Sequence, residues 1–319
     1  MGTSQDFVSD PSPVLPSRPF SKDPGVSPKP LFGDPTTPLL KERARLLYRH
    51  LPRTLAGEEE AVHQMRVAGR RLRVALPLLA CKPGGRRVRR AVKRLRELVG
   101  AAGGSRDLDV GLALFEERLR SLPEANPEGR LLRRRLRAAR ARSRARMAEA
   151  LLDLDIARLR RDLRAVVSRG GEGLFTVLVR LKGQREEQGA RLLAAFAALG
   201  DRFATEELHR LRIRARRLRY AAELADGLRE QDSGAPALFK ELQDQLGRIH
   251  DEQLLADWLE RQAKAAERRG QQALAAEARD QQSHFGEAAR QHHRSLVERG
   301  PADLVRAALE ALGGARNAA

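Results

Sequence analysis

The sequence predicts an all-α protein, and three observations support that fold class. Ala, Leu, Arg and Glu, which are all good helix formers, dominate the 319 residues. Aromatic residues make up only 4% of the chain and β-branched residues are also scarce, which disfavours strands. Hydrophobic residues account for 41% of the sequence. That fraction is enough for a packed core.

The chain is predicted to begin with a disordered arm, residues 1–36, that is rich in Pro and Ser. Nine of the sixteen prolines lie at or before Pro38. Thr37 and Pro38 are then expected to open the first helix, because Pro is favoured in the first helical turn. From there, residues 37–315 read as successive helices separated by Gly, Pro, Asp and Ser.

Two segments, residues 63–73 and 209–219, share the pattern H-x-x-R-x-x-x-R-R-L-R at an offset of 146 positions. On a helix, the polar members of each copy fall within an arc of roughly 80° and apolar residues lie opposite. These members are His63, Arg66, Arg70 and Arg73 in the first copy, and His209, Arg212, Arg216 and Arg219 in the second. We call these two sets the stripes.

The likeness between the two halves continues beyond the stripes. Residues 95–100 resemble residues 242–247, and Arg106-Asp107 matches His250-Asp251 after a Gly-Gly-Ser insertion in the first copy. Asp107 and Asp251 are expected to act as helix N-caps. The sequence therefore predicts two four-helix-type bundles, 37–170 and 171–315, that are related by a pseudo-twofold axis. Such packing brings the stripes face to face across one groove.

The charge of the chain indicates a polyanionic partner. The net charge is +19, and only eight of the 61 basic residues are lysines. A guanidinium group binds phosphate through two parallel hydrogen bonds, so this excess of arginine fits phosphate recognition. The single cysteine, Cys81, excludes a disulfide framework and a thiolate zinc site. No apolar run is long enough to span a bilayer, and we expect no membrane partner.

Further cations follow the first stripe. One arc of the next predicted helix carries Arg86, Arg89, Arg90 and Lys93, and Lys240 occupies the position of Lys93 in the second half. A denser set surrounds the helix that starts near residue 128, and we expect it to be solvated. This set comprises Arg133, Arg134, Arg135, Arg137, Arg140 and Arg144.

A basic helix face is most often simply solvated, but solvated faces usually mix acids with bases. The stripes contain no acid and repeat with their histidine in register, which favours an anion bound against them. His63 and His209 are interpreted as hydrogen-bond donors to phosphate, with a packed structural role as the alternative. Neither has a second metal-ligating side chain at ligand spacing on its own face, so we expect no metal and no cofactor.

The repeated motifs resemble the CHAD family, the conserved-histidine α-helical domain, over about residues 38–313. The resemblance implies two four-helix bundles with pseudo-twofold symmetry, a basic central groove and binding of inorganic polyphosphate. The sequence departs from the pattern where His250 replaces the equivalent of Arg106 and where the Gly-Gly-Ser insertion lengthens one turn.

The predicted function is non-catalytic binding of inorganic polyphosphate. The predicted binding residues are His63, Arg66, Arg70, Arg73, Arg86, Arg89, Arg90, Lys93, His209, Arg212, Arg216, Arg219 and Lys240. No phosphate-binding glycine loop or nucleophile–base pattern indicates an enzyme. Non-specific binding of nucleic acid through its phosphates stays open, and so does a helical scaffold for an acidic protein partner. We expect a cytoplasmic protein that collects on polyphosphate granules where these exist.

Overall fold

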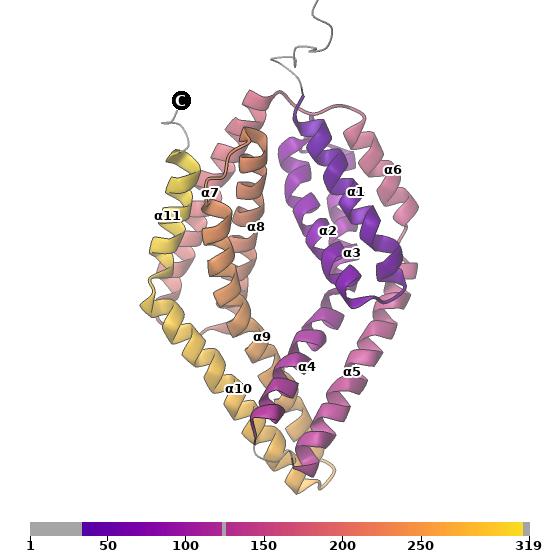
Figure 1. Cartoon of the computed structure of the whole chain (residues 1–319), viewed down its shortest axis with the longest axis vertical. Helices are drawn as coiled ribbons and strands as arrows, with labels where there is room; N and C mark the ends of the chain where they lie inside the picture. Colours follow the sequence, from indigo (N-terminus) through magenta and orange to yellow (C-terminus); the bar gives the residue numbers. More distant parts are fainter. Residues whose placement is uncertain (1–33, 123–125, 315–319) are drawn as a thin grey trace, which may run out of the picture. The chain divides into compact units, whose positions relative to one another are not determined.

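The computed structural model describes residues 34–122 and 126–314, and these residues confirm the all-α prediction (Figure 1). The helices are α1 (Thr36–Leu55), α2 (Glu59–Leu79), α3 (Arg86–Ala101), α4 (Gly103–Ser121), α5 (Pro127–Leu152), α6 (Ile156–Val167), α7 (Leu174–Leu199), α8 (Thr205–Arg229), α9 (Ala235–Glu267), α10 (Gln272–Glu298) and α11 (Pro301–Gly314). Within the described ranges no strand forms. A single pair of residues, Ala80 and Gly171, forms an isolated β-bridge there.

The first helix begins one residue before the predicted start, and the side chain of Asp34 accepts hydrogen bonds from its first turn. The Asp34 carboxylate accepts hydrogen bonds from the backbone N–H groups of Thr36 at 2.9 Å and Thr37 at 3.2 Å. It also accepts one from the backbone N–H of Gly171 at 2.6 Å, which ties the start of α1 to the segment before α7. The rest of the predicted arm, residues 1–33, lies outside the described residues.

Two apolar clusters hold the helices together. The larger one contains buried residues from α1, α2, α3, α6, α7, α8 and α11, from the first half of α9 and from the C-terminal halves of α5 and α10. The smaller one joins α4, α5 and α10 to the second half of α9, and its largest side chains include Phe115, Trp258 and Phe285. Both clusters combine residues from either side of position 170. The predicted division into two bundles at that position stays a prediction.

The predicted caps at Asp107 and Asp251 are wrong. Asp251 lies in the interior of one continuous helix, α9. Asp107 likewise lies inside α4, which begins at Gly103. An aspartate is a poor residue for a helix interior. Here a tertiary interaction offsets that preference, because a carboxylate oxygen of Asp251 lies 3.9 Å from Nη2 of Arg212 on α8.

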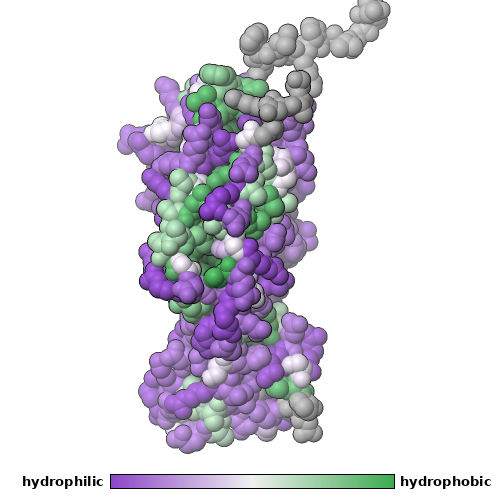
Figure 2. Space-filling model, turned by 90° about the vertical axis from the view of Figure 1, so that its left-hand side faces the viewer, coloured by the Kyte–Doolittle hydropathy of each residue, from purple (hydrophilic) through white to green (hydrophobic). Residues whose placement is uncertain are grey.

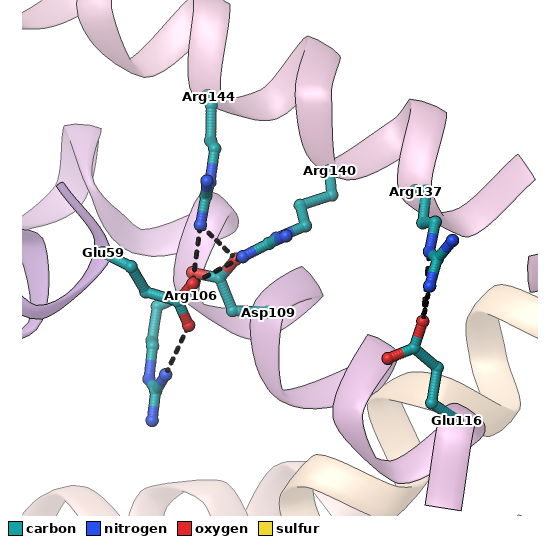
Figure 3. Close-up of polar contacts among 7 residues, drawn as sticks. All are labelled: Glu59, Arg106, Asp109, Glu116, Arg137, Arg140 and Arg144. Carbon is teal, nitrogen blue, oxygen red and sulfur yellow. Dashed lines mark hydrogen bonds and ion pairs between the residues drawn. The ribbon is translucent and has the colours of Figure 1, made fainter. Parts of the chain in front are cut away.

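The arginines of α5 are not simply solvated, as the sequence had predicted. Arg140 and Arg144 bind the buried carboxylate of Asp109 on α4 and the carboxylate of Glu59 on α2 (Figure 3). Arg137, which lies one turn before Arg140 on α5, binds Glu116 of α4. These ion pairs attach α5 to α4 and to the start of α2. Arg134 remains exposed.

The surface on the α11 side is uneven in polarity. Figure 2 shows hydrophobic residues gathered in the upper part of this view, above a mostly hydrophilic lower end. Exposed apolar side chains of the described residues include Phe175 and Val179 on α7. No helix in the described ranges is long and apolar enough to cross a membrane.

Candidate functional site

The two stripes lie on neighbouring helices. Helices α2 and α8 contact each other, and they face each other at the centre of Figure 1. Met65 and Leu72 on α2 are fully buried, as are Leu211 and Leu218 on α8. The apolar faces therefore point into the core as predicted, and the stripe residues are half-buried on the other side of each helix.

Five stripe residues form what we call the central arginine cluster: Arg66, Arg70, Arg212, Arg216 and Arg219. The pKa of Arg216 is lowered to about 9, mainly by burial and then by the positive charges of Arg70 and Arg212. The pKa of Arg66 is lowered to about 10, again mainly by burial and then by the charge of Arg70. The pKa of Arg70 falls through burial and through Arg212 and Arg219, although Tyr220 opposes this change. Like charges from both helices are thus crowded together.

Several polar atoms of the stripes lack a hydrogen-bond partner. Among the described residues, the buried Nε atoms of Arg66, Arg73, Arg212 and Arg219 and the Nδ1 atom of His63 make no hydrogen bond. Leaving a buried donor unsatisfied costs about 1–3 kcal/mol, and more for a charged group. Acceptor oxygens placed between the helices would remove this cost. The arrangement therefore suits an anion with many oxygens.

Local backbone geometry positions the two arginines nearest the histidines. Nη1 of Arg66 donates to the carbonyl oxygens of Ala102 and Gly103, at the junction between α3 and α4, with a distance of 2.7 Å to Gly103. Arg212 packs against Gly247 of α9, where a Cβ atom would lie 3.7 Å from Nε of the arginine. Arg66 is thus held at the junction between α3 and α4, and Arg212 lies against α9.

Histidine and aspartate side chains gather at one end of the cluster. Nδ1 of His209 lies 3.4 Å from Nδ1 of His250 on α9. The pKa of His250 is lowered to about 3, mainly by burial and then by the charges of Arg212 and His209. The pKa of Asp251 is raised to about 6, mainly by burial and also by Asp107, while Arg212 opposes this change. Burial and the charges of Arg212 and Arg216 also lower the pKa of His209, so both imidazoles are disfavoured in the protonated form.

In the folded chain His209 has a second histidine beside it, although its own helix face carries none. His250 follows it by 41 positions on a different helix, so the spacing within one helix could not show the contact. In the part of the chain that the structure describes, no group of three or more His, Cys, Asp or Glu side chains could hold a metal ion. His63 has a lowered pKa through burial and the charge of Arg106.

The other end of the cluster also carries an acid. Glu223, one turn beyond Arg219 on α8, lies 3.5 Å from Nε of that arginine. Arg71 of α2 binds the same carboxylate through two hydrogen bonds of 2.7 and 3.1 Å. The buried ring of Tyr220 lies under the guanidinium of Arg219, at 4.9 Å from the ring centroid. Carboxylates therefore bound the cluster at both ends.

The structure does not bring every predicted binding residue to the cluster. Arg90 on α3 binds Asp162 of α6 at 3.0 Å, and Lys240 on α9 binds Asp244 at 2.6 Å. Lys93 lies 4.0 Å from Glu97, and Arg89 donates to a backbone carbonyl of the loop before α3. These side chains are exposed, as is that of Arg86, and no contact between described residues joins them to the cluster. Arg73 lies at its edge, near Arg70 and Arg217.

Sequence reasoning missed five residues at the site: Arg106, Asp107, Tyr220, His250 and Asp251. Four of them were visible as a repeated motif, Arg106-Asp107 and His250-Asp251, but the two aspartates had been assigned as helix N-caps and neither Arg106 nor His250 had been counted among the binding residues. The recurrence of the motif behind each stripe was the signal that could have placed these residues at the site. Tyr220 directly follows the second stripe and showed no such signal.

The fold and the repeated motifs agree with comparisons to known proteins. The family model of the CHAD domain matches residues 39–260. Two curated relatives, the uncharacterized proteins MT2285 and Rv2226 of Mycobacterium tuberculosis strains CDC 1551 and H37Rv, are each 30% identical over 227 residues. The match covers 68% of this chain and 43% of each relative, so the chain spans less than half of their length.

Solved structures show the same fold at low sequence identity. The CHAD domain from the plant Ricinus communis superposes with a TM-score of 0.55 and 23% identity, over 86% of this chain and 90% of that domain. PptA from Streptomyces chartreusis superposes with a TM-score of 0.63 and 19% identity, over 84% of this chain and 99% of PptA. At these identities the likeness concerns the fold alone.

Proposed function

Since the chain belongs to the CHAD domain family, we propose that it binds inorganic polyphosphate through the central arginine cluster and catalyses no reaction on it. The observation that carries this proposal is the crowding of Arg70 and Arg216: burial and the charge of Arg70 lower the pKa of Arg216, and burial and the charges of Arg212 and Arg219 lower the pKa of Arg70. Neither guanidinium forms an ion pair with an acid of the described residues. A bound polyanion would offset the repulsion between them.

The chemistry of the cluster fits a chain of phosphates better than a nucleic acid. Single strands of nucleic acid are usually held by aromatic side chains on which the bases stack. Tyr220, the aromatic residue in contact with the cluster arginines, is buried under Arg219 and Arg71 and offers no open face. Inorganic polyphosphate has no base, and it requires only the guanidinium and imidazole groups that the cluster provides.

The half-buried position of the cluster makes each contact stronger than on an open surface. Charges that are partly removed from water interact more strongly, because the local dielectric constant is lower. The bound phosphates would raise the lowered pKa values of the arginines and of His63 and His209. Binding would then be tighter at mildly acidic pH, at which the imidazoles take up a proton.

The test is a titration of the full chain with long-chain polyphosphate, comparing two double variants of equal charge. Arg70→Gln with Arg216→Gln removes one arginine of the cluster from each stripe. Arg134→Gln with Arg135→Gln removes two charges from α5. We expect the first pair to lose at least about tenfold in affinity. The slope of affinity against salt should also fall by about two charges, because fewer counterions are released.

The control pair should lose less than about threefold, since only long-range attraction changes. Equal losses in the two pairs, with helicity intact by circular dichroism, would overturn the proposal. Duplex DNA of equal phosphate content is the second arm of the titration. If DNA binds as tightly as polyphosphate at physiological salt, the function is non-specific binding of phosphate backbones. If neither polyanion binds, the remaining hypothesis is that the protein is a helical scaffold for an acidic protein partner.

Localisation follows from the same site. We propose that the protein collects on polyphosphate granules in cells that contain them. A fluorescently tagged full chain should coincide with the granules, whereas the Arg70→Gln, Arg216→Gln double variant should be diffuse. If the double variant stays on the granules, the central arginine cluster is not what targets the protein to them.

A further inference from the structure

A pocket of about 380 Å³ lies between α4, α5 and α9, apart from the central arginine cluster. Its floor is formed by large apolar side chains: Leu108, Leu136, Leu254, Leu255 and Trp258. Pockets for small organic ligands span about 300–1,000 Å³, so this one is large enough for such a ligand. Trp258 is the only tryptophan of the sequence.

Three arginines line this pocket without a partner. Arg142 and Arg146 come from α5 and Arg261 from α9. Over the described residues, none of the three forms a hydrogen bond or an ion pair. This differs from Arg140 and Arg144 on the same helix α5, which are neutralised by Asp109 and Glu59 (Figure 3).

The pocket is separated from the central arginine cluster by a carboxylate. Asp107 lines the pocket, and its negative charge also acts on Arg66 and Arg70, whose pKa values it raises. A phosphate group that extended from the cluster towards the pocket would therefore meet a like charge. This separation argues for an independent site and against a simple continuation of the polyphosphate path.

The combination of unpaired guanidinium groups and an apolar floor defines the ligand chemistry. Inorganic polyphosphate has no apolar part and would gain nothing from the leucines. An uncharged apolar molecule would leave the arginines unused. A nucleotide has both parts, since its phosphates can bind arginine and its base can cover apolar and aromatic side chains. We propose that the α4–α5–α9 pocket binds a nucleoside triphosphate, with the base towards the floor and the phosphates towards the arginines.

The fluorescence of Trp258 tests this site directly, because no other tryptophan contributes. The full chain is titrated with three probes: ATP, inorganic tripolyphosphate and adenosine. ATP should change the emission of Trp258 at a concentration at least about tenfold lower than either of the other two, because only ATP has both parts. If tripolyphosphate acts as well as ATP, or if ATP leaves the emission unchanged, the proposal is overturned.

Single variants then locate the phosphates. Arg142→Gln and Arg146→Gln should each weaken the response to ATP by about fivefold or more, and Arg134→Gln, an exposed control on the same helix, should not. Equal losses in all three variants would overturn the proposal, since they would show attraction by net charge alone. Circular dichroism verifies that each variant is folded.

The inference is independent of the proposed polyphosphate site. The Arg70→Gln, Arg216→Gln variant should keep the response of Trp258 to ATP while it loses affinity for polyphosphate. If this variant loses the ATP response, ATP binds in the central arginine cluster and the pocket is not a nucleotide site. If it keeps both the ATP response and polyphosphate binding, the proposed function fails while the pocket site stands.

Discussion

Arg71 of α2 and Glu223 of α8 lie 152 positions apart in the sequence and form a bidentate ion pair, with N–O distances of 2.7 and 3.1 Å. The same carboxylate lies 3.5 Å from Nε of Arg219 in the central arginine cluster. Glu223 therefore joins the two stripe-bearing helices and also neutralises part of the cationic surface. These two roles predict opposite effects on stability and on anion binding when the carboxylate is removed.

The first prediction concerns Glu223→Gln, which keeps the shape of the side chain but removes its charge. Unfolding in denaturant should show a loss of about 1–3 kcal/mol, because a charge-assisted hydrogen-bond pair is weakened. Titration with polyphosphate should show tighter binding, by about two- to tenfold, because Arg71 and Arg219 regain their positive potential.

Glu260→Gln is the matched control for this prediction. It removes the same charge from an exposed pair with Lys264 on α9. Both stability and affinity should then change little, as for most exposed pairs. Weaker polyphosphate binding by Glu223→Gln would contradict the assignment of this residue to the edge of the binding surface.

The second prediction concerns Asp109, which is buried and binds both Arg140 and Arg144 (Figure 3). Asp109→Asn should lower the free energy of unfolding by about 3–5 kcal/mol, because two partly buried guanidinium groups lose their counter-charge. The affinity for polyphosphate should stay within about twofold of the wild-type value, since none of these residues belongs to the central arginine cluster.

Glu116→Gln tests whether burial explains the size of that effect. Glu116 binds Arg137 on the same two helices, but Arg137 is mostly exposed. We expect a loss of at most about 1 kcal/mol for this pair. Similar losses in Asp109→Asn and Glu116→Gln would refute the role given to the buried carboxylate.

The faces of α2 and α8 could be predicted from the sequence because a helix repeats every 3.6 residues. The buried Met65 and Leu211 and the half-buried Arg70 and Arg216 all lie where the periodicity placed them. His250 and Asp251 could not be placed in this way. They belong to a third helix, α9, and they approach Arg212 through the packing of α9 against α8, which no local pattern shows.

Local preference also misled the interpretation of single residues. An aspartate near a turn signal predicts an N-cap, yet Asp107 and Asp251 lie inside helices where they interact with arginines. The arginines that surround α5 looked solvated because their acidic partners, Asp109 and Glu59, lie 31 or more positions away. Charge pairing across helices is fixed by tertiary structure, and a sequence pattern cannot show it.

The last prediction concerns pH and the adjacent residues His250 and Asp251. The pKa of His250 is lowered to about 3. The unfolded chain therefore takes up a proton below about pH 6.5, its ordinary pKa, while the folded chain does not. Its contribution to stability is complete above that pH and is lost as the pH falls towards 3. The pKa of Asp251 is raised to about 6, so its contribution is complete below its ordinary value of 3.8 and is lost as the pH rises through 6.

Between about pH 4 and 6 the two contributions oppose each other, and the single variants should separate them. Relative to the wild type, His250→Asn should gain stability as the pH falls through this range, and Asp251→Asn should lose stability, each by about 1 kcal/mol per pH unit. The double variant should track the wild type. The measurement is denaturant unfolding at a series of pH values, with the difference from the wild type plotted against pH. If the stability differences of the two single variants change with pH in the same direction, burial beside Arg212 does not control the pKa values of His250 and Asp251.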